Sequence, residues 1–271
     1  MSPRITDYAR DRAIGLIKSG YRKLRREPAE RVILVAGVQR SGTNMVMDIF
    51  DRCIDTDVYH ETDERAFDNY QMLPIDRIQG LVLSSRSRCF IIKCLCELQS
   101  IDTLMGSFGN VRVVWVVRHY HDVVNSMLVS FRNQAEQVKR IIRYRVSDGW
   151  LSEGMSDETY NLLCETVGDK ELDDASASAL QWYFRNILFF EKNLENHEDV
   201  MLVRYEDLVR NPSMQMDRLY GFAGLDESYH FSKEIYSSSI GRKKPLDIQS
   251  DVEILCQALY NKFETYFSPS K

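Results

Sequence analysis

Residues 32–44 read VILVAGVQRSGTN, and this stretch decides the fold that we expect. Its first five residues form a short, β-branched, apolar run that is typical of a buried parallel strand. Residues 45–53 follow with apolar side chains at helical spacing. The loop at 37–44 therefore joins a strand to the start of a helix. Because the first-turn amides of a helix point outward and its dipole adds positive charge, this loop predicts an anion-binding site.

The loop departs from the pattern of kinases and GTPases. A Walker loop ends in Gly-Lys-Ser/Thr, where the lysine contacts the terminal phosphates and the hydroxyl contacts magnesium. Here Thr43 and Asn44 stand in those two positions, and the only cation in the loop is Arg40. The sequence therefore predicts an anionic ligand other than ATP with magnesium.

Further short apolar runs alternate with helical patterns along the chain. They lie at residues 90–92, 111–117 and 200–203, with a shorter extended piece at 58–59. This alternation predicts an α/β fold of the P-loop-like, three-layer kind, with a central, mostly parallel sheet and helices on both faces. In such folds ligands bind at the carboxyl ends of the strands. Residues 132–199 are mostly helical in pattern, and we interpret them as an insertion within one domain that spans residues 31–271.

Composition indicates an ordinary globular protein. The chain has 271 residues, of which 44% are apolar and 28% charged, and it lacks the apolar run of about 18–20 residues that a transmembrane helix needs. Its charged N-terminus does not resemble a signal peptide, so we expect a cytoplasmic location. The six cysteines lack the paired spacing of a disulfide framework or a zinc site, and we expect reduced thiols and no metal.

The N-terminal segment is basic although the whole chain carries a net charge of -5. Residues 1–31 hold nine Arg and Lys side chains against four acidic ones. We expect a basic helix within residues 1–30, packed on the domain with a solvated basic face. The alternative is peripheral contact with an anionic membrane through residues 4–26.

A second candidate anion site follows the strand predicted at 111–117. Arg118 stands where this strand leaves the sheet, and Ser126 falls within the following helix. A guanidinium fork matches the geometry of phosphate, and a neighbouring hydroxyl adds a directed donor. Both residues are expected in the same crevice as the first loop.

Three motifs together resemble the sulfotransferase family. They are QRSGTN at 39–44, the R-x7-S pair Arg118 and Ser126, and VRYEDL at 203–208, in the order in which that family has them. The likeness covers roughly residues 31–250, and the arginine in the first loop resembles the carbohydrate and tyrosylprotein branches. It implies 3′-phosphoadenosine 5′-phosphosulfate as co-substrate, with the 5′-phosphosulfate on the first loop and the 3′-phosphate on the R-x7-S pair.

The resemblance also implies a set of site residues. Lys93 resembles the family lysine that follows a middle strand and would reach the sulfuryl group. The SIGRK sequence at 239–243 resembles the C-terminal loop that closes over the 3′-phosphate and adenine. The residues expected to bind the donor are Gln39, Arg40, Ser41, Gly42, Thr43, Asn44, Arg118, Ser126, Ser239, Gly241, Arg242 and Lys243.

Sulfuryl transfer also needs a base. The group moves to an acceptor hydroxyl by in-line displacement, so the protein must supply cations at the leaving oxygen and remove a proton from the acceptor. Arg40 supplies a cation at the leaving oxygen. For the base we choose Glu61, because the tyrosylprotein branch places its basic Glu, also followed by Thr, at similar spacing. His60 is the alternative, because small-molecule sulfotransferases use a His in this region.

The resulting expectation is a sulfotransferase that acts on a hydroxyl of a sugar, glycan or glycolipid, with no nucleic-acid partner. One rival is a P-loop nucleotide kinase, which the missing lysine disfavours. The other is a non-catalytic nucleotide-binding adaptor on the same scaffold, which would need no base.

Overall fold

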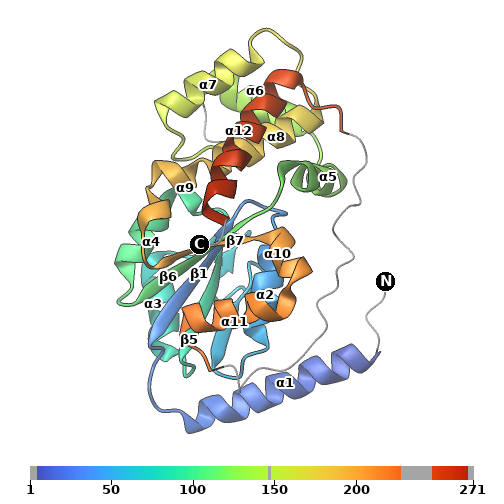
Figure 1. Ribbon diagram of the computed structural model, residues 1–271. Coiled ribbons are helices and arrows are strands. Elements are labelled where there is room, and N and C mark those ends of the chain that lie inside the picture. Colours follow the sequence, from blue (N-terminus) through green and yellow to red (C-terminus); the bar gives the residue numbers. More distant parts are fainter. Residues whose placement is uncertain (1–4, 146–147, 227–245, 268–271) are drawn as a thin grey trace.

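A five-stranded parallel sheet forms the centre of the protein (Figure 1). The computed structural model describes residues 5–145, 148–226 and 246–267. The strands are β1 (Arg31–Gly37), β2 (Thr56–Tyr59), β5 (Cys89–Cys94), β6 (Val111–Val117) and β7 (Val200–Arg204). Across the sheet they lie in the order β2-β5-β1-β6-β7. A separate antiparallel hairpin joins β3 (Phe67–Asp68) to β4 (Gln71–Met72). The predicted parallel sheet is confirmed, whereas the hairpin was not expected.

Helices surround this sheet. They are α1 (Ile5–Leu24), α2 (Thr43–Asp51), α3 (Ile75–Ser84), α4 (Ile101–Ser107), α5 (Tyr120–Ser130), α6 (Gln134–Tyr144), α7 (Asp157–Val167), α8 (Asp174–Asn186), α9 (Leu188–Glu191), α10 (Tyr205–Arg210), α11 (Pro212–Ala223) and α12 (Ser250–Phe267), with short 3₁₀ turns η1 (Leu98–Ser100) and η2 (Leu194–Asn196).

The central strand buries both of its faces, which explains its continuous apolar sequence. Val32 and Leu34 pack into a core shared with α3, α4, α5, α8, α9 and α12. Ile33 and Val35 point the other way, into a core shared with α2, α10 and α11. The three-layer, P-loop-like arrangement predicted from the sequence is therefore confirmed.

The helical region at residues 132–199 joins the first of these cores. Its helix α8 packs against α5, α6 and α12, and Trp182 and Phe184 of α8 are fully buried. We therefore propose that this region is a helical insertion in one domain and not a second domain.

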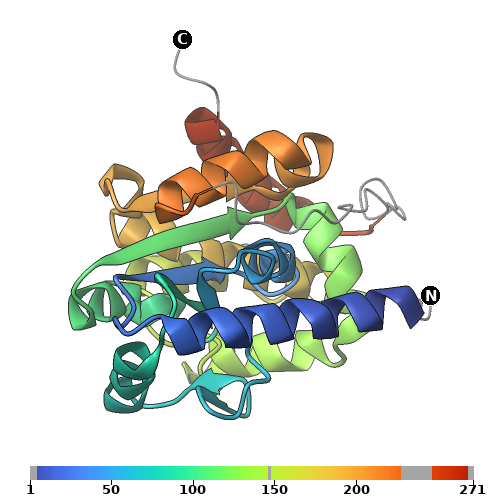
Figure 2. The ribbon, with the colours of Figure 1, turned by 90° about the horizontal axis from the view of Figure 1, so that it is seen from below.

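The N-terminal helix α1 runs along the outside of the domain (Figure 2). Lys18 and Arg22 turn inward and pair with Asp51 and Asp57 respectively. We expected the basic side chains of this helix to be solvated. Lys23 is exposed, as expected, whereas Lys18 and Arg22 are paired with acidic residues of the domain, so the expectation is wrong for these two. Within the described part of the chain, no helix is both long enough and apolar enough to cross a membrane.

Candidate active site

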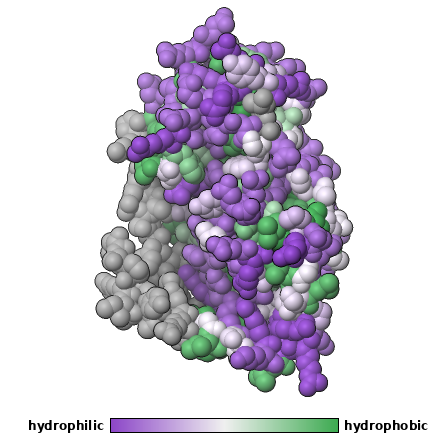
Figure 3. All heavy atoms as spheres, turned by 180° about the vertical axis from the view of Figure 1, so that it is seen from behind, coloured by the Kyte–Doolittle hydropathy of each residue, from purple (hydrophilic) through white to green (hydrophobic). Residues whose placement is uncertain are grey.

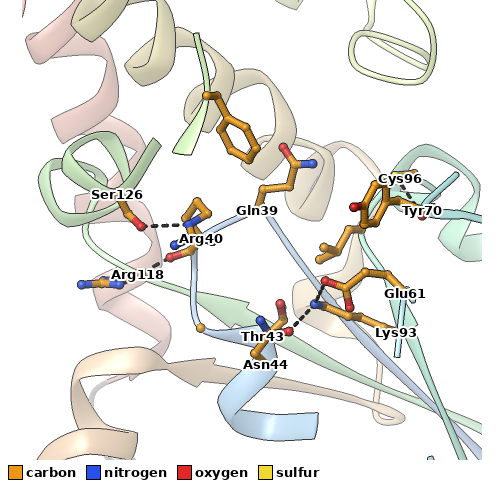
Figure 4. Close-up of a pocket in the computed structure, with 13 residues that line it drawn as sticks. Gln39, Arg40, Thr43, Asn44, Glu61, Tyr70, Lys93, Cys96, Arg118 and Ser126 are labelled. Carbon is orange, nitrogen blue, oxygen red and sulfur yellow. Dashed lines mark hydrogen bonds and ion pairs between the residues drawn. The ribbon is translucent and has the colours of Figure 1, made fainter. Parts of the chain in front are cut away.

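A cavity of about 390 Å³ opens at the carboxyl ends of the strands (Figure 4). The β1–α2 loop, the segments that follow β2, β5 and β6, the β3–β4 turn and helix α5 all contribute to its walls. Parallel pairing explains this convergence, because Gly37 at the end of β1 lies opposite Val116 near the end of β6. The two anion sites predicted from separate parts of the sequence thus share one cavity.

The β1–α2 loop turns sharply into α2 through left-handed backbone conformations. Arg40 has a φ of 69° and Gly42, the residue before the helix, has a φ of 98°. A β-carbon at Gly42 would collide with the ring of Tyr205. Helix α2 has no side-chain cap and no acidic residue in its first turn, so its amides remain suited to an anion.

Replacing Gly42 with Ala is expected to lower the free energy of unfolding by about 1–3 kcal/mol, because alanine is strained at this φ and collides with Tyr205. The matched control is Gly80→Ala, inside α3, where nothing lies within 4 Å of the added carbon. That change should raise stability by up to about 1 kcal/mol. Urea unfolding of both variants checks this, and equal effects would contradict the steric role of Gly42.

Arg40, Arg118 and Ser126 meet on one side of the cavity. The Arg40 Nε donates a hydrogen bond of 2.8 Å to the Ser126 Oγ. The Arg118 guanidinium donates to the Arg40 carbonyl at 3.5 Å and lies 4.3 Å from the centre of the Tyr205 ring. The Trp182 indole donates to the Arg118 carbonyl at 3.0 Å. Two guanidinium groups and a hydroxyl are thus held together, an arrangement that suits a phosphate.

Glu61 and Lys93 form an ion pair across the cavity from this cluster. The Lys93 Nζ lies 2.5 Å from the Glu61 Oε1 and also donates to the Asn44 side chain. The Lys93 side chain is only 2% exposed, and this burial lowers its pKa, although the Glu61 carboxylate opposes the change. The pair therefore brings a cation and a carboxylate to the edge of the β1–α2 loop.

His60 is held away from this pair by another partner. Its Nε2 lies 3.0 Å from the Asp51 Oδ2, and this hydrogen bond raises the pKa of His60. The His60 side chain lines an adjoining hollow, whereas Glu61 borders both this hollow and the main cavity. The structure therefore places Glu61 at the main cavity and His60 beside Asp51 at the adjoining hollow.

The remaining predicted donor-binding residues divide into three groups. The first group borders the cavity and consists of Gln39, Thr43 and Asn44. Ser41 is completely buried, and its hydroxyl has no hydrogen-bond partner among the described residues. Such an unsatisfied group fits a loop that completes its hydrogen bonds with a bound anion. The predicted residues Ser239, Gly241, Arg242 and Lys243 lie outside the described residues.

Several residues of the cavity were missed by the sequence reasoning. Tyr70, Leu95, Cys96 and Phe131 form a largely apolar part of its lining. Tyr205 supports both Gly42 and Arg118. Tyr205 belongs to the VRYEDL motif, but nothing in that pattern indicates that its ring packs under the first loop.

Comparison with known proteins identifies one family. A family model described as a sulfotransferase domain matches residues 30–255. A solved sulfotransferase from Alicyclobacillus acidocaldarius is 12% identical and similar over 88% of this chain and 94% of that chain, with a TM-score of 0.51. The sulfotransferase domain of an olefin synthase from Synechococcus PCC 7002 is also 12% identical, over 87% of this chain and 96% of that chain, with a TM-score of 0.50. Curated protein sequences yield no match.

Proposed function

Because the chain belongs to the sulfotransferase family, we propose that it moves a sulfuryl group from 3′-phosphoadenosine 5′-phosphosulfate to the hydroxyl of a sugar, glycan or glycolipid. The observation that carries this proposal is one cavity with two kinds of chemistry. One side holds the guanidinium groups of Arg40 and Arg118 beside Ser126, and the other holds the Glu61–Lys93 pair.

The cationic side suits a donor with two separated anionic groups. The α2 amides and Arg40 would hold the 5′-phosphosulfate, and Arg118 with Ser126 would hold the 3′-phosphate. The donor supplies the activated sulfuryl group. The protein's contribution is to fix its position and to place positive charge where the leaving phosphate becomes more negative. Arg40 also contacts Ser126, so the residues proposed for the two anionic groups adjoin each other.

The other side of the cavity suits an acceptor hydroxyl. Glu61 would accept the proton of this hydroxyl, and the Lys93 ammonium next to it would offset negative charge near the anion loop. Tyr70, Leu95 and Phe131 offer apolar surface in the same cavity, which suits the face of a sugar ring or the apolar part of a glycolipid. These contacts support an acceptor that combines a hydroxyl with such a face.

The two rival functions have less support. A kinase would need a lysine and a Ser/Thr in place of Thr43 and Asn44. A non-catalytic adaptor would need only the cationic side of the cavity. It would gain nothing from Lys93, whose burial is costly and is offset only by its ion pair and hydrogen bond.

Thermal-shift measurements with two nucleotides test the proposed donor. Adenosine 3′,5′-bisphosphate, the product left after transfer, is expected to raise the melting temperature in a concentration-dependent way, because a ligand that binds only the native state stabilises it. ATP with magnesium serves as the control and should have a much smaller effect. A shift with ATP and none with the bisphosphate would overturn the proposal in favour of a kinase.

A further inference from the structure

Helix α1 docks on the domain through cations. Lys18 is 5% exposed, and its ammonium donates to the Asp51 carbonyl at 3.0 Å and to the Thr56 hydroxyl at 3.1 Å. Arg22 lies 2.9 Å from the Asp57 carboxylate and donates to the Ser87 hydroxyl at 3.1 Å. Lys18 and Arg22 therefore face the protein, and these contacts fix how the helix is rotated about its axis.

The opposite side of α1 is apolar and exposed. Leu16, Ile17 and Leu24 are 70%, 48% and 85% exposed, and their spacing places them on one helix face. Lys23 is exposed on the helix close to them, and Arg26 is exposed two residues beyond the end of the helix. We call these five residues the outer face of α1. In Figure 3, apolar residues stand among hydrophilic ones along the lower end of the molecule, the end at which Figure 1 has α1.

This arrangement reverses the usual amphipathic helix, which turns its apolar side inward and its charges to water. From it we propose that the outer face of α1 docks on an anionic lipid bilayer. The three aliphatic side chains enter the headgroup region, and Lys23 and Arg26 contact the negative headgroups. Lys18 and Arg22 take no part, because acidic groups of the protein already hold them. The inference is independent of the chemistry in the cavity.

A bilayer fits this face better than a second copy of the chain does. Three aliphatic side chains can bury only on the order of 200–350 Å² of apolar surface. A stable protein interface needs about 800 Å² from each partner. A lipid surface needs no such continuous patch, since side chains enter it one by one and basic residues add attraction to anionic headgroups.

Vesicle co-sedimentation of the full chain tests the proposal. We expect binding to vesicles of phosphatidylcholine with phosphatidylserine, and much weaker binding to phosphatidylcholine alone. The triple variant Leu16→Ser/Ile17→Ser/Leu24→Ser should lower the partition coefficient by at least about tenfold, because it removes the apolar contacts. A Lys23→Gln/Arg26→Gln variant should lose the preference for the anionic vesicles.

The matched control replaces three similarly exposed apolar residues on α3, α11 and α12, namely Leu83→Ser/Met214→Ser/Ile254→Ser. It should bind vesicles like the unchanged protein. All of these residues are exposed, so folding is expected to survive and melting curves verify it. Absence of vesicle binding by the unchanged protein, or equal loss in both triple variants, would overturn the proposal. A concentration-dependent dimer that only the α1 variant loses would instead assign this face to a second copy.

Discussion

Replacing Glu61 with Gln is expected to reduce the rate of sulfuryl transfer by about 10²–10⁴-fold, the usual contribution of a general base. The amide cannot accept the proton of the acceptor hydroxyl. Its oxygen can still accept a hydrogen bond from Lys93, so the cavity should keep its shape. Adenosine 3′,5′-bisphosphate should therefore raise the melting temperature of the variant as it does that of the unchanged protein. Initial rates with a labelled donor, together with these thermal shifts, provide the measurement.

Two further variants separate the candidate bases. His60→Gln breaks the hydrogen bond to Asp51 but leaves Glu61 beside Lys93, so only a small change in rate is expected. Glu64→Gln removes an exposed carboxylate three residues along the chain and should change nothing. A normal rate in the Glu61 variant would remove that residue from the mechanism. A complete loss in the His60 variant would transfer the role to His60.

The parts of the site that the sequence predicts are those that follow directly from strands buried on both faces. β1 and β6 stand out as apolar runs because helices cover both sides of each strand. The residues just after them must then meet at one edge of the sheet, since neighbouring strands are parallel. Arg40 and Arg118 could therefore be placed at the same edge of the sheet from the sequence alone.

The order of the strands is what the sequence could not supply. β2 lies beside β5, and this neighbour relation puts Glu61 against Lys93. β7 lies beside β6, which brings Tyr205 under Gly42. Local periodicity carries no information on which strand pairs with which, so neither contact was predictable.

The choice between His60 and Glu61 also needed three-dimensional neighbours. The two residues are adjacent in the chain and both stand at the end of β2, so spacing cannot separate them. Their environments differ because Asp51 binds the imidazole while Lys93 binds the carboxylate. The orientation of α1 was not predictable for the same reason, since Asp51 and Asp57, the acidic partners of Lys18 and Arg22, lie more than thirty residues further along the chain.

Replacing Arg118 with Met is expected to weaken binding of adenosine 3′,5′-bisphosphate by at least about 30-fold, because truncating one partner of a close charge pair costs about 2–5 kcal/mol. The proposed 3′-phosphate would lose its guanidinium partner and keep the Ser126 hydroxyl, and isothermal titration calorimetry gives the affinity. Residual binding should also depend less on salt, since one ionic contact is gone.

The same strand provides the control for this change. Arg118 directly follows β6 and lies 3.8 Å from the Asp122 carboxylate. Arg112, at the other end of β6, likewise pairs with a carboxylate, that of Asp199 at 3.4 Å, and lies 5.3 Å from the centre of the Phe222 ring. Arg112→Met therefore removes a comparable guanidinium with an ion pair and an aromatic contact, but far from the cavity. If the two variants bound the bisphosphate equally weakly, the effect would come from general loss of stability. A loss confined to Arg118→Met assigns the effect to the cavity, either through a contact of its guanidinium with the nucleotide or through its hydrogen bond to the Arg40 carbonyl, because the losses common to both arginines cancel in the comparison.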